Sequence, residues 1–236
     1  MTQKVFIFLS VILVLFCCCS SNDESPVQKP EGEQENEQVK NFSFLALGDS
    51  YTIGQGVEQD QSWPFQLKSS TQASKKRIET LTVIARTGWT TGNLLNAIDE
   101  QSPSNHDLVS LLIGVNNQYQ RGSFSKFQEE FNTLLDIAID LAQSNKKVMV
   151  ISIPDYGVTP FGASNSQTIA EELDTYNAYI KQQCVATEVV FVDVTTISRN
   201  LGASENALAS DNLHPSGYQY NLWVEKMLPV VEEILK

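Results

Sequence analysis

The sequence predicts a three-layer α/β/α sandwich built on a five-stranded parallel sheet. The first observation is a set of five short apolar runs that do not alternate strictly with polar residues, as expected of strands buried on both faces. The second is that helical patterns separate these runs, and strand–helix alternation produces a parallel sheet covered by helices. The five runs are Phe42–Leu47, Leu81–Ala85, Leu108–Ile113, Val148–Ile153 and Val189–Val194.

The helices are predicted from apolar positions that recur every three or four residues. The clearest pattern runs from Ser125 to Gln143, and two others run from Gln167 to Gln183 and from Ser216 to Leu235. A shorter helix is expected over Thr90–Glu100, with Thr90 or Thr91 as its N-cap. The chain shows no internal repeat and no sign of a second folded domain.

The charge of the chain argues against one class of partner. The 236 residues carry a net charge of −12, and the densest basic cluster is Lys75-Lys76-Arg77. Nucleic-acid binding needs a basic surface that displaces counterions from phosphate. We therefore expect no nucleic-acid partner.

The first residues are predicted to be a targeting segment rather than part of the fold. Lys4 precedes the apolar run Val5–Phe16, which fits the core of a secretory signal and is short for a membrane span. Cys17, Cys18 and Cys19 follow, and this cluster resembles the lipobox of bacterial lipoproteins, in which the cysteine at the cleavage site is acylated. Cys19 is the preferred lipidation site because a polar stretch follows it, with Cys17 and Cys18 as alternatives.

This interpretation divides the chain into three parts. Residues 1–19 form the signal peptide and lipobox, residues 20–40 form a polar disordered linker, and residues 41–236 form the folded domain. The protein is accordingly expected in the bacterial cell envelope, facing the periplasm or the surface, and held at the membrane through its N-terminal lipid only. Cys184 lies on an apolar helical stripe and is predicted to be a buried structural thiol.

Ligands of an open parallel sheet bind beyond the carboxyl ends of the strands. The residues that follow each predicted strand are therefore the candidates for chemistry. They are Gly48-Asp49-Ser50-Tyr51, Arg86-Thr87-Gly88-Trp89, Gly114-Val115-Asn116-Asn117, Pro154-Asp155-Tyr156-Gly157 and, after a loop, Asp211-Asn212-Leu213-His214-Pro215.

These segments contain the components of a serine hydrolase. A hydroxyl nucleophile such as Ser50 needs a general base, and the base needs a carboxylate that orients it. Asp211 and His214 are three residues apart, so one tight turn can bring both side chains together. The backbone N–H groups of Ser50 and Gly88, with the side-chain amide of Asn116, are candidate donors for an oxyanion hole.

Taken in order, Gly48-Asp49-Ser50-Tyr51, Gly88, Gly114-x-Asn116 and Asp211-x-x-His214 resemble the four sequence blocks of the SGNH hydrolases, also called GDSL esterases or lipases. The resemblance implies a flavodoxin-like sandwich with Ser50 as nucleophile, His214 as base and Asp211 as acid. It also implies an oxyanion hole made by Ser50, Gly88 and Asn116. The third block usually reads GxND, whereas this chain has Asn117 in the last position.

Other residues near these blocks have weaker assignments. Asp49 is predicted to brace the turn rather than to act in catalysis, and Trp63 is predicted to pack in the core. Asp155 and Tyr156 either line the pocket or support the fold. Trp89 is a candidate contact for an acyl or sugar group.

The function expected from the sequence is hydrolysis of a carboxylic ester through an acyl-enzyme, without a cofactor or metal. The candidate substrates are an acylated glycan, a lysophospholipid or a small ester. Two alternatives remain, namely acyl transfer to an alcohol and a catalytically silent envelope module that binds glycan or lipid. The sequence lacks the GxSxG, GxxxxGK[ST], HExxH and CxxC motifs of rival enzyme classes.

Overall fold

A computed structural model describes residues 38–236. The predicted signal peptide, the lipidation site at Cys19 and most of the predicted linker lie outside the described residues. The described chain belongs to one compact unit.

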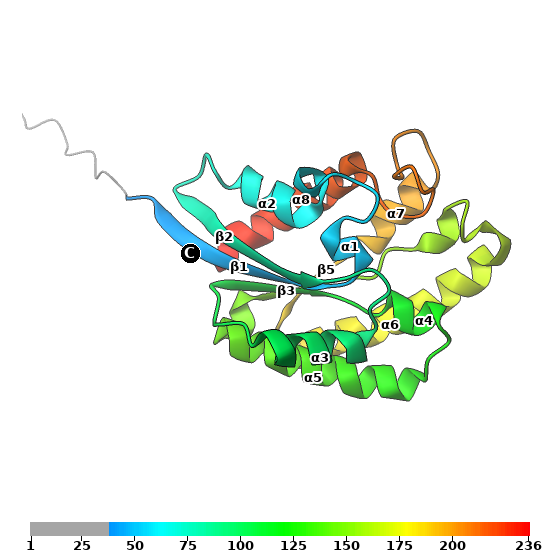
Figure 1. The fold of residues 1–236 in the computed structure, drawn as a ribbon, viewed down its shortest axis with the longest axis horizontal. Helices are drawn as coiled ribbons and strands as arrows, with labels where there is room; N and C mark the ends of the chain where they lie inside the picture. The colour runs from blue at the N-terminus through cyan, green and yellow to red at the C-terminus, as the bar shows by residue number, and fades with distance from the viewer. Residues whose placement is uncertain (1–37) are drawn as a thin grey trace, which may run out of the picture. The chain divides into compact units, whose positions relative to one another are not determined.

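The sheet has five parallel strands in the order β2-β1-β3-β4-β5. Figure 1 shows that this sheet is the middle layer of an α/β/α sandwich, so the predicted fold class is confirmed. The strands are β1 Lys40–Gly48, β2 Lys76–Ala85, β3 Leu108–Leu112, β4 Val148–Ile151 and β5 Val190–Val192.

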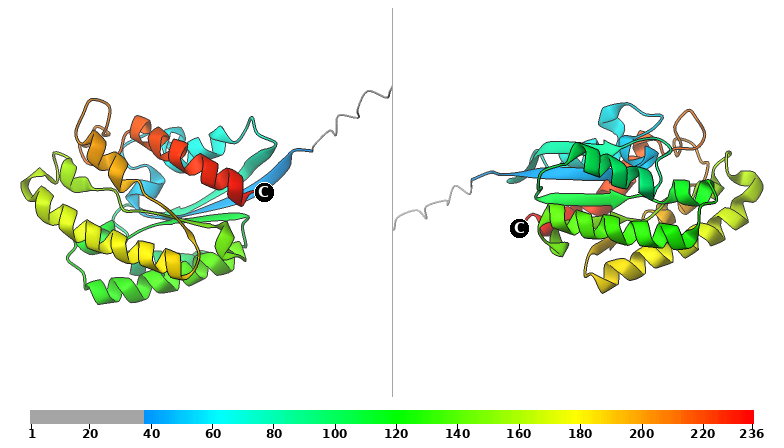
Figure 2. Two further views of the ribbon diagram at one scale, coloured as in Figure 1. Left: turned by 180° about the vertical axis from the view of Figure 1, so that it is seen from behind. Right: turned by 60° about the horizontal axis from the view of Figure 1, so that its bottom comes forward.

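Two sets of helices cover the sheet. Helices α2 (Trp63–Ser70) and α8 (Gly217–Ile234) lie over one face, and α7 (Thr195–Leu201) lies beside α8 (Figure 1, Figure 2). The other face is covered by α3 (Thr91–Gln101), α5 (Phe124–Ala142) and α6 (Ser166–Ala186). The remaining pieces are short: α1 Ser50–Ile53, α4 Val115–Tyr119, η1 Gln59–Gln61, η2 Asn145–Lys147, η3 Tyr156–Val158 and η4 Ala163–Asn165.

The outer strands depart from the expectation of burial on both faces. β2 starts at Lys76 rather than at Leu81, and much of it is exposed or half-buried. It lies at the edge of the sheet and pairs with β1 alone, so one side of its backbone has no neighbouring strand. β5 lies at the opposite edge and is also only partly buried. The central strands β3 and β4 are buried along their whole length, as expected.

Helix α2 is an element that the periodicity did not reveal. It is short, and its apolar residues do not gather on one clear stripe. Its start carries a local signal, because Ser62 is the N-cap and Pro64 lies in the first turn, where proline needs no hydrogen-bond partner for its nitrogen.

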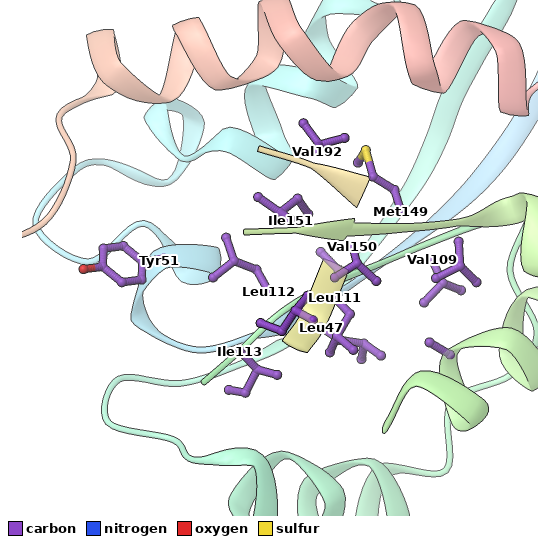
Figure 3. Close-up of a cluster of buried hydrophobic side chains, with 14 of the residues drawn as sticks. Leu47, Tyr51, Val109, Leu111, Leu112, Ile113, Met149, Val150, Ile151 and Val192 are labelled. Atoms are coloured by element: carbon purple, nitrogen blue, oxygen red, sulfur yellow. The ribbon is translucent and has the colours of Figure 1, made fainter. Parts of the chain in front are cut away.

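The core forms where the central strands meet the two helical layers. Figure 3 shows part of it, including Leu111 and Val150, with Tyr51 at the edge of the cluster and its hydroxyl pointing away from the other labelled side chains. Burying each aliphatic side chain of this kind contributes about 1.5–3 kcal/mol. Cys184 is fully buried, as predicted, and burial raises the pKa of its thiol to about 12.

The strand order places a reversal in the middle of the sheet. From β1 the chain moves outward to β2, then crosses back over β1 to β3 and continues the other way. At such a switch point the connections leave neighbouring strands toward opposite faces, which opens a crevice beyond their carboxyl ends. The crevice therefore lies beyond β1 and β3, the strands that precede Ser50 and Asn116.

Candidate active site

Ser50 is the first residue of α1, directly beyond the end of β1. The turn is tight, because a side chain on Gly48 would lie 2.6 Å from the carbonyl oxygen of Leu112 at the end of β3. Ser50 is 5% exposed. Within the described chain, neither its hydroxyl nor its backbone N–H makes a hydrogen bond.

Asp211 and His214 form a hydrogen-bonded pair, as their spacing predicted. The Nδ1 atom of His214 lies 2.7 Å from Oδ2 of Asp211. The other carboxylate oxygen, Oδ1, accepts the backbone N–H groups of Leu213 at 3.0 Å and His214 at 2.9 Å. Asn212 has a left-handed φ of 58°, which asparagine tolerates better than most residues. This turn fixes the imidazole relative to the carboxylate.

The surroundings of Asp211 favour its ionised form. Partial burial alone would raise the pKa of Asp211, but hydrogen bonds from the His214 ring and from two backbone N–H groups outweigh it and lower the pKa. A charged Asp211 can therefore hold the proton of His214 on Nδ1, which leaves Nε2 as the basic nitrogen.

Two contacts join this turn to the segment that carries the nucleophile. The ring of Tyr51, the residue after Ser50, lies edge-on to the His214 ring with centroids 5.6 Å apart. Farther along, a Cβ on Gly56 would lie 2.8 Å from Cβ of Ala209 and 3.2 Å from Oδ2 of Asp211. The structure thus brings Ser50, Asp211 and His214 into one region, although no direct hydrogen bond joins Ser50 to His214 among the described residues.

The candidate oxyanion donors come from the next two connections. Gly88 has a φ of 81°, and its backbone N–H has no partner in the described chain. Apart from Gly88 itself and its two neighbours, no described residue has an atom within 4 Å of where its Cβ would be. Asn116 donates one amide hydrogen to the carbonyl oxygen of Trp89 at 2.9 Å. An amide has two such hydrogens, so this bond orients Asn116 and leaves the second one for a ligand.

Side-chain hydrogen bonds lock these loops together. Gln120 donates to the carbonyl oxygen of Gly88 at 3.2 Å, and the hydroxyl of Thr87 donates to Oε1 of Gln55 at 2.7 Å. Gln55 follows α1, so the loop with Gly88 is tied both to the nucleophile segment and to α4. Such bonds hold donors in place before a charge develops, which is what transition-state stabilisation requires.

Asn117, the departure from the usual third block, has a defined structural role. Its Oδ1 accepts the backbone N–H of Thr91 at 3.0 Å, and its Nδ2 donates to the Thr91 hydroxyl at 2.7 Å. That hydroxyl in turn donates to Oε2 of Glu130. Asn117 therefore joins α4 to α3 and, through Glu130, to α5, next to Asn116.

Asp49 braces the nucleophile turn, as predicted. It caps α1 by accepting the Tyr51 backbone N–H at 3.0 Å through Oδ1. Its side chain is fully buried, and Oδ2 has no hydrogen-bond partner among the described residues. Burial raises the pKa of this carboxyl to about 7, against the opposing effect of its hydrogen bonds.

The weaker assignments separate into two groups. Trp63 is fully buried against Phe44 in the core, as predicted. Asp155 is also buried and forms an ion pair with Arg199 at 2.8 Å, so its role here is structural. Tyr156 lines a surface cavity, whereas Trp89 is half-buried against the core and contributes its carbonyl oxygen to the Asn116 amide.

Several residues that brace the candidate site, or that line the cavity next to it, were not predicted from the sequence. The links from Thr91 and Glu130 to Asn117 and the cavity residues Tyr119 and Phe161 join positions far apart in the chain. No short motif marks such pairings. The contact between Tyr51 and His214 had a partial signal, because Tyr51 adjoins the nucleophile. Among the described residues, no cluster of three or more His, Cys, Asp or Glu side chains is arranged to hold a metal ion.

Comparison with known proteins identifies the family. The model of the GDSL-like Lipase/Acylhydrolase family matches residues 46–222, which is most of the chain. The chain therefore belongs to this family of lipases and acylhydrolases. The matched range contains all five residues that the sequence analysis assigned to the catalytic and oxyanion positions.

One curated relative and two solved structures illustrate the likeness. A multidomain esterase from Ruminococcus flavefaciens is 28% identical over 133 residues, which cover 55% of this chain but only 16% of that protein. A G-D-S-L family lipolytic protein from Veillonella parvula has a TM-score of 0.62 at 19% identity, covering 82% of this chain and 99% of its own. An acetyl xylan esterase from Geobacillus stearothermophilus has a TM-score of 0.62 at 20% identity, covering 83% and 96%. At these identities the structural likeness establishes the fold.

Proposed function

We propose that this protein is a serine esterase that cleaves carboxylic esters through an acyl-enzyme intermediate, with Ser50 as nucleophile and His214 as general base. The observation that carries the proposal is the 2.7 Å hydrogen bond between Asp211 and His214 Nδ1, beside a Ser50 whose hydroxyl and N–H are unpaired in the described chain. Membership of a lipase and acylhydrolase family supports the same reaction class.

In the acylation step, Oγ of Ser50 attacks the ester carbonyl carbon while Nε2 of His214 takes the hydroxyl proton. Asp211 keeps the other ring nitrogen protonated and stabilises the imidazolium that forms. Collapse of the tetrahedral intermediate breaks the bond to the alcohol oxygen, and His214 returns the proton to that oxygen. The alcohol departs, and the acyl group stays on Ser50 as an ester.

In the tetrahedral intermediate a negative charge develops on the carbonyl oxygen of the substrate. Hydrogen-bond donors at fixed positions must stabilise that charge. The N–H groups of Ser50 and Gly88 and the free amide hydrogen of Asn116 fill this role. Each donor of this kind contributes roughly a 10²–10³-fold increase in rate. Deacylation repeats these steps with water in place of the serine hydroxyl, and it releases the carboxylic acid.

The test is hydrolysis of a series of p-nitrophenyl esters, from acetate to palmitate, by the purified full chain in detergent. Ser50→Ala and His214→Ala are each expected to lower kcat by roughly 10³-fold or more. Ser210→Ala is the matched control, because Ser210 is exposed and adjoins Asp211, and its activity should equal that of the parent. A Ser50→Ala variant with full activity would contradict the proposal.

Covalent labelling separates the esterase from the alternatives. A fluorophosphonate should label the parent at the peptide that contains Ser50 and should not label Ser50→Ala. No labelling of the parent would favour a silent binding module. Labelling together with transfer of the acyl group to an added alcohol, in preference to water, would favour an acyltransferase.

We also propose that the protein acts in the bacterial cell envelope, held at the membrane by a lipid on Cys19. The support is the apolar run Val5–Phe16, the cysteines that follow it and the polar residues beyond them. Among the described residues, no helix is both long and apolar enough to span a membrane.

A further inference from the structure

A groove with exposed aromatic rings lies beyond the carboxyl ends of β3 and β4. It has a volume of about 840 Å³ and is built by α4, the turn before α5, η3, η4 and the first half of α6. We call it the aromatic groove. The residues that line it include Gln118, Tyr119, Arg121, Tyr156, Phe161 and Glu172.

Three aromatic rings form one wall of the aromatic groove. The ring of Tyr119 lies 6.1 Å from that of Tyr156 and 5.9 Å from that of Phe161, measured between centroids. Tyr156 is buried, but Tyr119 is 54% exposed and Phe161 is 50% exposed. The two exposed rings lie side by side and offer a small apolar surface against which the ring of a ligand can pack.

Polar groups lie beside the aromatic wall in a fixed arrangement. The hydroxyl of Tyr156 donates to Oε1 of Gln118 at 2.9 Å, and Nε2 of Gln118 donates to Oε2 of Glu172 at 2.6 Å. The second carboxylate oxygen of Glu172 makes no hydrogen bond within the described chain. The groove also contains Arg121, so it offers both an acceptor and a charged donor.

The aromatic groove lies next to the candidate active site. Tyr119 and Asn116 are both on α4, three residues apart, which places their side chains on the same side of the helix. Tyr156 also lines a small cavity bounded by Tyr51 and Leu213, the neighbours of Ser50 and His214. A substrate whose ester is at Ser50 can therefore extend into the groove along α4, from Asn116 toward Tyr119.

We propose that the aromatic groove binds the sugar ring of an acylated glycan, as the alcohol part of the substrate. The C–H face of a sugar ring packs on an aromatic ring, while its hydroxyl groups need hydrogen-bond partners. Tyr119 and Phe161 supply the rings, and Glu172 and Arg121 supply the partners. This inference rests on the proposed esterase function and names the substrate class of the same site.

A fatty acyl chain fits the groove less well. Covering the free carboxylate oxygen of Glu172 or the guanidinium of Arg121 with hydrocarbon would remove water from charged groups without replacing its hydrogen bonds. A sugar hydroxyl replaces those bonds, so a glycan occupies the groove at a lower cost.

The test compares two acetate esters that differ only in the alcohol. Acetylated xylo-oligosaccharide presents a sugar ring, whereas ethyl acetate presents no ring that can stack, and both reactions release acetic acid. Tyr119→Ala and Phe161→Ala should each raise KM for the oligosaccharide about three- to tenfold. Hydrolysis of ethyl acetate should stay within about twofold of the parent, because these residues lie outside the proposed catalytic set.

Two variants serve as matched controls. Phe161→Tyr keeps a ring at the position and should retain the parent KM for the oligosaccharide. Tyr218→Ala removes a tyrosine that is 53% exposed and lies outside the aromatic groove, so it should change neither reaction. All four variants are checked by thermal unfolding for an unchanged fold.

The outcomes of the two proposals can be told apart. An unchanged KM for the oligosaccharide in both alanine variants overturns the groove proposal, even if Ser50→Ala abolishes all hydrolysis. Faster turnover of lysophosphatidylcholine than of the oligosaccharide, with the same loss in Phe161→Ala, also overturns it, since the groove would then serve lipid. Full activity of Ser50→Ala overturns the esterase proposal instead. Binding of the oligosaccharide to Ser50→Ala, weakened by adding Phe161→Ala, supports the groove without any catalytic readout.

Discussion

The carboxyl group of Asp49 is fully buried beneath the nucleophile turn, with one oxygen bonded to a backbone N–H and the other unpaired among the described residues. Burying an ionised carboxylate costs free energy when one of its oxygens has no hydrogen bond, so the neutral form of Asp49 is favoured. Burial raises the pKa from the ordinary 3.8 to about 7. The residue that braces Ser50 is thus itself sensitive to pH.

This raised pKa predicts how stability varies with pH. Between about pH 4 and pH 7 the carboxyl is protonated in the folded protein and ionised in the unfolded chain, so unfolding releases a proton. The contribution of Asp49 to the free energy of unfolding is therefore complete below pH 4 and is lost as the pH rises through about 7. Urea unfolding at intervals from pH 5 to pH 8 should show a decline that is smaller in Asp49→Asn.

Asp107→Asn is the matched control for this experiment. Partial burial acts to raise the pKa of Asp107, but hydrogen bonds from the backbone and side chain of Ser43 lower it. Its contribution is therefore lost only in acid, so the variant should lose a similar amount of stability at every pH from 5 to 8. Parallel curves for the parent and Asp49→Asn would show that Asp49 is ionised in the folded protein, against the prediction.

At the scale of secondary-structure elements, three helices meet through the hydrogen bonds of Thr91. Its N–H and hydroxyl contact Asn117 of α4, and the same hydroxyl donates to Glu130 of α5. The direction of this chain depends on the amide at position 117, which donates to the hydroxyl so that the hydroxyl can donate onward. An aspartate there has no proton to give.

This directionality predicts a non-additive pair of substitutions. Asn117→Asp leaves two carboxylates competing for one hydroxyl proton and should lower the free energy of unfolding by about 1–3 kcal/mol. In the double variant with Glu130→Gln, the glutamine amide can donate to Thr91 and Thr91 can donate to the aspartate. The chain then runs in reverse with its donors and acceptors matched, and most of the lost stability should return.

A double-mutant cycle measured by urea unfolding checks the prediction, and Glu129→Gln on the exposed side of α5 is the control partner. The control should restore nothing to Asn117→Asp. Simple additivity of the Asn117 and Glu130 substitutions would mean that the hydrogen-bond direction is unimportant for the junction of α3, α4 and α5.

The same elements show what the sequence could and could not predict. The stripe on α5 and the continuous apolar runs of β3 and β4 identify those elements because their periodicity reflects how they are buried. The start of β2 was not predicted because an edge strand is only partly buried, and its polar residues interrupt the apolar run that marks a buried strand. The Asp211–His214 pair was predictable because both residues lie on one turn, whereas the bonds of Thr91 depend on tertiary packing.

At the scale of the whole molecule, the position of the candidate site follows from the strand order. The reversal between β1 and β3 puts the segment of Ser50 beside the segment of Asn116, and the long connection after β5 brings Asp211 and His214 to the same edge. The order of the sequence blocks along the chain therefore suffices to predict that these segments meet at one edge of the sheet, and the catalytic roles of their residues stay a prediction. The aromatic groove was not predictable, since Tyr119 of α4 meets Tyr156 of η3 and Phe161 of the turn after η3 only in the folded chain.

The last prediction concerns the location of the protein in the cell. It depends on Cys17, Cys18 and Cys19, which lie outside the described residues. Each buried CH₂ of an attached lipid contributes about 0.8 kcal/mol to membrane binding, so a lipid on Cys19, as proposed above, should decide whether the protein is found with the membrane. The full chain and its single Cys→Ser variants are to be expressed in bacteria with an alkyne-tagged fatty acid and then fractionated. Cys19→Ser should lose both the label and the membrane fraction, whereas Cys17→Ser and Cys18→Ser should keep both.

Cys184→Ser provides the control, because Cys184 is buried in the folded domain and its loss should leave labelling unchanged. Loss of label in Cys17→Ser or Cys18→Ser, with Cys19→Ser unaffected, would move the lipid to that cysteine and keep the anchor. An unlabelled parent in the soluble fraction would remove the anchor altogether. In that case the protein would have to reach a membrane-bound substrate by diffusion. The proposed location in the envelope would then be wrong, and the proposed esterase function would be unaffected.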